Sequence, residues 1–172
     1  MHPAWLLKIG RFVSGKLLPK GWAYPIVSGP LRGTRFVLGA APGEGGGATR
    51  YFNLYEPEQT QAFVNTVSRG QTVFDIGANV GYYTLLGSKL VGEDGQVVAF
   101  EPVTQNLFNL YRHIVLNKAK NVIIIPAACS DRCSLATFDR GDNCALGHLV
   151  QGGIPDAIVR KNEPDPKNWT VQ

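Results

Sequence analysis

The centre of the chain predicts an α/β fold with a parallel sheet, on three observations. Residues 72–76 form a short apolar run that leads into a glycine-bearing turn, which is typical of a buried strand. Apolar residues at helical spacing follow over 83–90, and a second apolar strand over 96–101 ends on Glu101. A strand, a turn, a helix and a strand that ends on an acid make half of a Rossmann-like nucleotide site.

The glycine turn reads Gly-Ala-Asn-Val-Gly over residues 77–81. A dinucleotide site is expected to read G-x-G-x-x-G, and here Asn79 replaces the middle glycine. No Gly-Lys-Ser/Thr follows, which excludes a P-loop. S-adenosylmethionine carries no phosphate and combines a ribose, an adenine and a zwitterionic methionine tail beside a cationic sulfonium. An acid on each side of a close-approach turn fits that cofactor better than a dinucleotide.

The two acids are expected to lie at the ligand edge, because open α/β sheets bind ligands beyond the carboxyl ends of their strands. Glu101 is expected to accept both ribose hydroxyls. Asp75 is expected to orient the turn or to take the amino group through water. The competing interpretation is that Asp75 only caps the turn and Glu101 is a solvated strand end. The methionine tail is expected to lie against backbone groups of Gly77, Ala78, Asn79 and Gly81.

Residues 73–84 (Val-Phe-Asp-Ile-Gly-Ala-Asn-Val-Gly-Tyr-Tyr-Thr) and 98–102 (Val-Ala-Phe-Glu-Pro) together resemble the FkbM family of S-adenosylmethionine-dependent methyltransferases. Smaller matching pieces are Tyr-Glu-Pro-Glu at 55–58, Asn117, and residues 127–131. The resemblance covers roughly residues 50–140. It implies a seven-stranded class I methyltransferase fold and methyl transfer, usually to a hydroxyl of a sugar or secondary metabolite.

The resemblance also suggests roles outside the turn. Ser130 and Asp131, which follow a third strand, are placed to meet the adenine amine, with an ordinary turn as the alternative. Tyr51, Tyr55 and Glu56 form either a lid over the cofactor or a packed helix start. No catalytic base can be assigned.

The family's later Asp-x-Glu-Gly segment has no match in the chain, so the fold is expected to be incomplete on the acceptor side. One sheet edge is then expected to expose an apolar row that favours self-association. The alternative functions are a cofactor-binding module without catalysis and a membrane-surface interaction protein.

Positive charge is concentrated at the start of the chain. Six of the 17 basic residues precede the first acid, Glu44, which leaves 11 basic and 13 acidic residues for the remainder. The net positive charge of the chain therefore comes from an N-terminal extension, and nucleic-acid binding by the whole domain is not expected. Residues 4–18 predict a basic amphipathic helix that packs on the domain or contacts an anionic membrane. The expected location is cytoplasmic, in line with the reduced thiols described below, or membrane-peripheral through this helix.

Further elements follow from periodicity and turn residues. Residues 22–39 predict a hairpin, Pro57 starts a helix that ends near Gly70, and a short strand is predicted at 134–138. Strand 121–127 is too uniformly apolar to be expected at a sheet edge. Thr104 is expected to cap a helix that buries Leu107, Leu110, Tyr111 and Ile114. The predicted organisation is an extension at 1–50, a cofactor-binding core at 51–140 and an irregular tail at 141–172.

The three cysteines fit reduced thiols, since they are odd in number and form no C-x-x-C pair. A zinc site from Cys129, Cys133, Cys144 and His148 matches no standard spacing, so no metal is expected. His113 is interpreted as a surface or half-buried histidine rather than a base.

Overall fold

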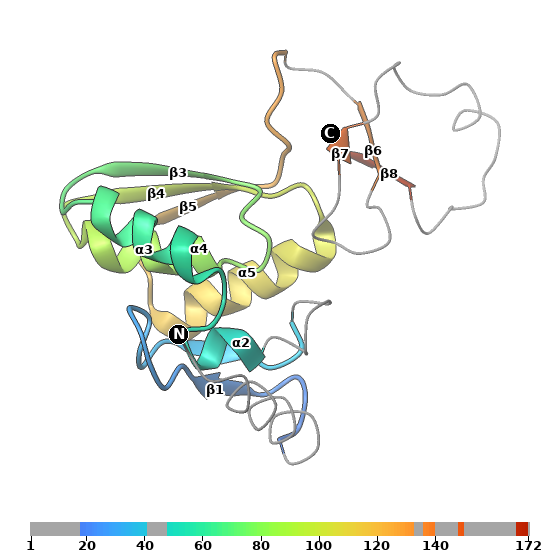
Figure 1. The fold of residues 1–172 in the computed structure, drawn as a ribbon. Helices are drawn as coiled ribbons and strands as arrows, with labels where there is room; N and C mark the ends of the chain where they lie inside the picture. The colour runs from blue at the N-terminus through green and yellow to red at the C-terminus, as the bar shows by residue number, and fades with distance from the viewer. Residues whose placement is uncertain (1–17, 41–47, 133–135, 140–147, 150–167, 172) are drawn as a thin grey trace.

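The computed structural model describes residues 18–40, 48–132, 136–139, 148–149 and 168–171. Its centre is a parallel sheet in the order β3-β4-β5 (Figure 1), made of β3 (Thr72–Ile76), β4 (Gln96–Phe100) and β5 (Val122–Ile125). All three strands are those predicted. Ile76 pairs with Phe100 and Phe100 with Ile125, so the three strands end together at one edge. The described residues therefore have a Rossmann-like α/β topology, as the sequence predicts.

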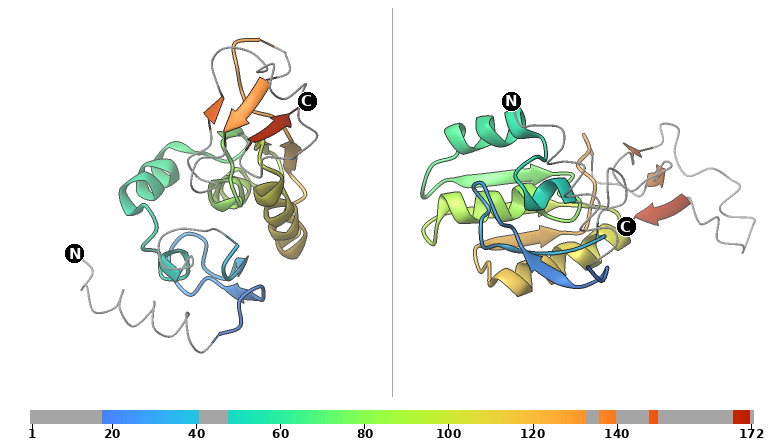
Figure 2. Two further views of the ribbon diagram at one scale, coloured as in Figure 1. Left: turned by 90° about the vertical axis from the view of Figure 1, so that its right-hand side faces the viewer. Right: turned by 60° about the horizontal axis from the view of Figure 1, so that its bottom comes forward.

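Three helices cover one face of this sheet (Figures 1 and 2): α3 (Pro57–Thr66), α4 (Tyr82–Val91) and α5 (Thr104–Asn117). Two details of the prediction for α5 are wrong. Val103 is the N-cap residue and makes no side-chain capping bond, so Thr104 already lies inside the helix. Tyr111 is 49% exposed, because the inward face of α5 is formed by Leu110 and His113, which are fully buried.

An N-terminal layer lies on the far side of the helices from the sheet (Figure 1). It contains α2 (Ala48–Tyr51) and the antiparallel hairpin of β1 (Ala23–Pro25) and β2 (Arg35–Val37), which confirms the predicted hairpin. Its apolar residues form one buried cluster with those at the start of α4, and this cluster includes Ile26, Leu31, Phe36, Leu38, Tyr51, Val80, Tyr82, Leu85 and Leu86. The described residues of this N-terminal segment therefore form a packed third layer.

His113 joins this layer to the glycine turn. Its Nε2 accepts a hydrogen bond from the Val37 backbone N–H at 2.9 Å. Nδ1 must then carry the proton, which it donates to the Val80 carbonyl at 2.6 Å. The ring also packs on Phe36, with 4.0 Å between ring centroids. His113 is fully buried, so the expected surface or half-buried position is wrong, and its two hydrogen bonds to backbone groups give it a structural role.

The other face of the sheet is open among the described residues. Phe74, Ile76 and Ile123 are exposed there, and β3 pairs with β4 alone in the part of the chain that is described. The sequence predicts an exposed apolar row at a sheet edge, and the structure shows exposed apolar residues on a face of the sheet as well as an unpaired β3 edge among the described residues. β5 also lies at an edge of the described sheet, contrary to its predicted interior position. Its apolar residues Val122 and Ile124 instead pack against the cluster that contains Leu110 of α5.

A small antiparallel sheet in the order β7-β6-β8 lies beyond the carboxyl ends of the parallel strands (Figure 1). β6 (Ala136–Asp139) corresponds to the strand predicted at 134–138. β7 (His148–Leu149) and β8 (Asn168–Val171) fall in the segment predicted to be irregular, where β6 pairs with both. The predicted helix at 4–18 lies almost wholly outside the described residues. In the described part of the chain, no helix has the length and hydrophobicity needed to cross a bilayer.

We predict that His113→Phe lowers the free energy of unfolding by about 2–4 kcal/mol at pH 7.5, since it leaves two buried backbone groups without partners. Burial lowers the pKa of His113 from 6.5 to about 4. The stability that the neutral His113 gives the folded state is therefore fully present above pH 6.5, and it is lost as the pH falls toward 4, because the unfolded state then binds the proton more tightly. Denaturant titrations of both proteins should show the gap shrink by about 1.4 kcal/mol per pH unit across that window. The carboxylates are common to both proteins and cancel in the difference. A gap that does not change with pH would contradict the buried neutral histidine.

Candidate functional site

The glycine turn leaves the sheet at the carboxyl edge and adopts left-handed backbone conformations. The φ angles of Gly77, Asn79 and Gly81 are 80°, 51° and 92°. Asparagine is among the few residues other than glycine that enter this region readily. Asn79 can therefore stand where the dinucleotide pattern has its middle glycine.

Each of the five backbone N–H groups of the turn is already hydrogen-bonded within the protein. Gly77 and Ala78 both donate to the Phe100 carbonyl at 2.9 Å, and Gly81 donates to the Ala78 carbonyl. The Asn79 N–H donates to Glu101, and the Val80 N–H to the Asn79 side-chain oxygen, each at 2.7 Å. Phosphate sites at such turns depend on free backbone N–H groups. This turn has none to offer.

Glu101 holds the turn to the start of α5. Its Oε2 accepts from the Asn79 N–H, and its Oε1 accepts from the Val103 N–H at 2.9 Å and the Asn106 side-chain amide at 3.1 Å. The side chain is only 3% exposed, and burial raises its pKa, although these donors oppose the rise. A carboxylate has about four acceptor positions. One therefore remains, enough for one of the two ribose hydroxyls without loss of a protein contact, and the ribose role stays a prediction. The alternative of a solvated strand end is wrong, because Glu101 is buried.

Asp75 faces the helical side of the sheet and meets the start of α4. Its Oδ2 accepts a short hydrogen bond of 2.5 Å from the Thr84 hydroxyl. Burial raises the pKa of Asp75, and the bond from Thr84 opposes that rise. A carboxylate near a helix N-terminus also interacts favourably with the helix dipole. Asp75 therefore anchors the start of α4, and the roles predicted for it toward the turn and the cofactor stay predictions.

The two glycines of the turn differ in their surroundings. A Cβ on Gly77 would meet no atom within 4 Å, so the backbone there faces open space. A Cβ on Gly81 would lie 2.5 Å from Cδ1 of Leu110, which is fully buried. Gly77 therefore leaves room for a ligand, whereas Gly81 is required by the packing of α5.

The structure does not bring Ser130 and Asp131 against the turn. Both are exposed, and the Ser130 hydroxyl and the Arg132 guanidinium donate to the Asp131 carboxylate. Arg132 and Ser130 lower the pKa of Asp131. The adenine role predicted for this pair stays a prediction.

The residues predicted as a lid or a packed helix start lie beside the start of α4. The Tyr83 hydroxyl donates to Glu56 at 2.9 Å, and the Tyr55 and Tyr82 rings contact edge to face at 4.8 Å. The Tyr51 hydroxyl donates to the Phe36 carbonyl at 2.7 Å, which places Tyr51 in the core. Arg50, which the sequence analysis does not single out, stacks over Tyr55 at 4.1 Å. Arg50 belongs to no motif or periodic pattern in the sequence, so the sequence does not indicate this contact.

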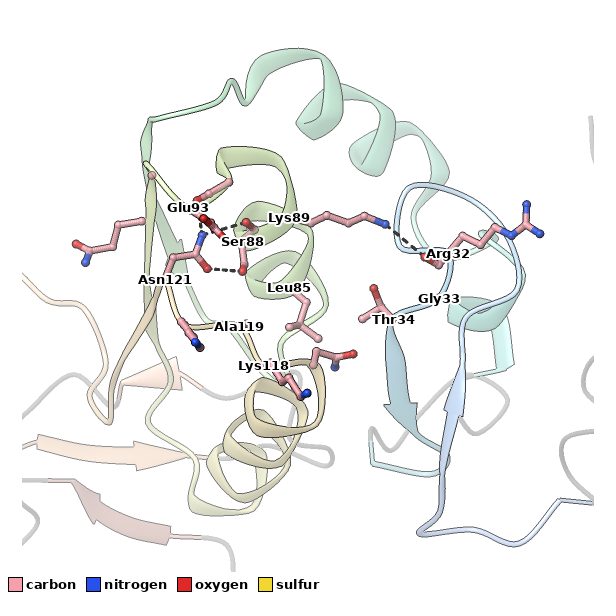
Figure 3. Close-up of a pocket in the computed structure, with 15 residues that line it drawn as sticks. Arg32, Gly33, Thr34, Leu85, Ser88, Lys89, Glu93, Lys118, Ala119 and Asn121 are labelled. Atoms are coloured by element: carbon pink, nitrogen blue, oxygen red, sulfur yellow. Dashed lines mark hydrogen bonds between the residues drawn. The ribbon is translucent and has the colours of Figure 1, made fainter.

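A groove of about 920 Å³ lies at the other end of the sheet, between the N-terminal layer and the ends of α4 and α5 (Figure 3). Its lining includes Gln96 and Asn121, at the amino-terminal ends of β4 and β5. Ligands of open α/β sheets bind at the carboxyl edge. This groove is therefore separate from the turn site.

The described residues contain no group of three or more His, Cys, Asp and Glu side chains placed to hold a metal. Cys129 is a free, exposed thiol. Cys133 and Cys144, the other cysteines of the rejected zinc site, lie outside the described residues.

Solved methyltransferases are similar to this chain. An S-adenosylmethionine-dependent methyltransferase from Aquifex aeolicus is 26% identical over 51% of this chain and 45% of its own, with a TM-score of 0.39. Precorrin-6y C5,15-methyltransferase from Geobacter metallireducens is 20% identical over 45% of this chain and 41% of its own, with a TM-score of 0.41. Aeropyrum pernix fibrillarin with natively bound S-adenosylmethionine is 14% identical over 56% of this chain and 48% of its own, with a TM-score of 0.38.

This chain thus spans less than half the length of each of these three proteins. No family model and no curated protein matches it. The likeness does not extend beyond part of the fold.

We predict that Gly77→Ala and Gly81→Ala differ sharply in their effect on stability. Gly77→Ala should cost about 1–2 kcal/mol, the strain of a left-handed alanine. Gly81→Ala carries the same strain and also displaces Leu110, so its cost should be larger by about 1–3 kcal/mol. Urea denaturation of the wild type and the two variants measures both losses of stability. Equal losses would show that the close approach of Gly81 to α5 is wrong.

Proposed function

We propose that the chain binds S-adenosylmethionine at the carboxyl edge of β3 and β4 and belongs to the S-adenosylmethionine-dependent methyltransferases. The observation that carries this proposal is the hydrogen bonding of the turn. Its five N–H groups are engaged internally, and it is flanked by the carboxylates of Asp75 and Glu101. A turn whose own N–H groups are all engaged and which lies between two carboxylates favours a cationic ligand without phosphate.

The residues present fit that cofactor. The remaining acceptor position of Glu101 suits a ribose hydroxyl, and the Asp75 carboxylate suits the ammonium group. The open space at Gly77 admits the methionine tail close to the backbone. When bound, S-adenosylmethionine supplies an electrophilic methyl group, whose in-line transfer depends mainly on proximity and alignment. The contribution of these residues is therefore binding and orientation.

The finer assignment is an FkbM-type methyltransferase that modifies a hydroxyl of a sugar or secondary metabolite. The motif set at 73–84 and 98–102, with Tyr55 and Glu56 beside the start of α4, supports it. A hydroxyl acceptor also benefits from a general base, and none is assigned here. The acceptor is a small molecule or a glycan.

A second candidate is a cofactor-binding module without methyl transfer. The open side of β3 favours it, since among the described residues no strand pairs with that edge and Phe74 and Ile76 are exposed. Ligands of open α/β sheets lie between walls from both sides of the topological switch point. The described strands supply one of those walls.

We predict that calorimetry detects binding of S-adenosylmethionine and S-adenosylhomocysteine but not of NAD or ADP. Asp75→Asn should weaken binding of S-adenosylmethionine about five- to tenfold, because a charge-assisted hydrogen bond becomes a neutral one while Asn can still accept from Thr84. Glu93→Gln, at an exposed acid on the opposite edge, is the matched control. Tighter binding of ADP than of S-adenosylhomocysteine would overturn the assignment.

We further predict little or no transfer of labelled methyl to hydroxylated acceptors by purified 1–172 protein, even at saturating cofactor. Proximity supplies most of the acceleration in this chemistry, and one wall of the crevice is not supplied by the described residues. Scintillation counting of acceptor fractions provides the measurement. Robust transfer by monomeric protein would reject the second candidate and support the enzyme.

A further inference from the structure

The N-terminal hairpin and α5 form one continuous surface without acidic residues, which we call the hairpin–α5 surface (residues 18–40 and 104–120). The sequence has no Asp or Glu in 18–40 or in 102–130. The two segments are joined by hydrogen bonds. Arg112 donates to the Gly21 carbonyl at 2.7 Å, and Asn117 exchanges two bonds with the Arg35 backbone.

Six cations belong to this surface. His113 is buried, and burial keeps its pKa low, so it adds no charge at neutral pH. Five of the six side chains are exposed, and Arg112 is partly buried. The six residues are Lys20, Arg32, Arg35, Arg112, Lys118 and Lys120.

Large apolar side chains stand exposed among these cations. Phe108, Tyr111 and Val115 follow one another at helical spacing along the outward face of α5, and Phe108 and Val115 are 64% and 75% exposed. Trp22 is 68% exposed and directly follows Gly21, whose carbonyl accepts a hydrogen bond from Arg112 of α5. The inward positions of α5 are filled by Leu110 and His113, so packing within the domain does not require the outward residues to be apolar.

The basic surface continues into the groove of Figure 3. Arg32, Lys118 and Lys120 line it together with Lys89, whose ammonium donates to the carbonyls of Pro30 and Arg32. Lys89 therefore joins the hairpin loop to α4. Glu93 is the acidic residue in this lining.

We propose that the hairpin–α5 surface binds the surface of an anionic lipid bilayer. Exposed Trp, Phe and Tyr beside aliphatic residues and a surplus of Lys and Arg are the features of interfacial membrane contacts. Anionic headgroups complement the six cations, and each lysine or arginine near such a surface adds to the attraction. Val115, the most exposed member of the α5 stripe, is aliphatic, which suits the acyl boundary of a bilayer and not base stacking, whereas the rings of Phe108, Tyr111 and Trp22 fit either partner, so the test below includes a nucleic acid.

The sequence adds an independent argument. The basic amphipathic pattern of residues 4–18 runs directly into Leu18 and Lys20, at the start of this surface. A bilayer in contact with the hairpin–α5 surface would be within reach of that segment. The proposal does not depend on the cofactor or the acceptor.

The test is co-sedimentation of full-length protein with phosphatidylcholine vesicles that contain about one third phosphatidylglycerol. Phe108→Ser combined with Val115→Ser should weaken binding about tenfold or more, since both side chains leave the interface. Lys118→Asn combined with Lys120→Gln should weaken it about fivefold per lysine, and Asn tolerates the left-handed backbone at Lys118.

Phe74→Ser is the matched control, because Phe74 is also 64% exposed but lies on the open face of the sheet. It should bind vesicles as the wild type does, and unchanged melting temperatures should accompany all three variants. Salt should reduce binding, and pure phosphatidylcholine vesicles should bind weakly. Failure to bind the anionic vesicles, equal loss in the Phe74 control, or tight binding of single-stranded RNA without vesicle binding would overturn the proposal.

Discussion

The buried carboxylate of Glu101 is the interaction on which the ligand edge depends. It accepts hydrogen bonds from three donors on two different segments, the glycine turn and the beginning of α5. Removing one partner from such a group leaves a buried charge or a buried donor without compensation, which is far more costly than the net gain from any single bond. The turn cannot move without disturbing the end of β4 and the start of α5. That rigidity fits a site in which geometry, rather than acid–base chemistry, is the main contribution of the protein.

The same turn is fixed from its other side by the N-terminal layer. Val80 sits in the cluster shared with the hairpin, and its carbonyl is held by His113, which also takes the Val37 N–H. A histidine in this position can satisfy one donor and one acceptor at once, which no apolar residue can do. The hairpin is thus coupled to the ligand edge by this imidazole ring as well as by the shared apolar cluster. The basic surface that the hairpin shares with α5 is held by the same set of contacts.

The features set by local sequence were predicted well. The apolar runs at β3, β4 and β5, the glycine turn and the helical spacing of α4 all depend on short-range patterns, and the structure places them as expected. The features that were predicted wrongly depend on partners that are distant in the sequence. The burial of His113 follows from the hairpin, more than seventy residues away, and nothing in its own helix indicates it. The exposure of Tyr111 arises because the hairpin and sheet meet α5 at Leu110 and His113 instead. Likewise, β7 and β8 are defined by pairing with β6 and have no clear periodicity of their own.

The central claim is that the turn at residues 77–81 is a closed, acceptor-rich site whose N–H groups are satisfied by the protein itself. Amide hydrogen exchange by NMR on the free protein tests it most directly. The account predicts slow exchange at Ala78, Asn79 and Gly81 without ligand, and no further protection on addition of ADP. Fast exchange at these amides in the free protein, with protection when ADP is added, would show an open phosphate-binding loop and contradict the account.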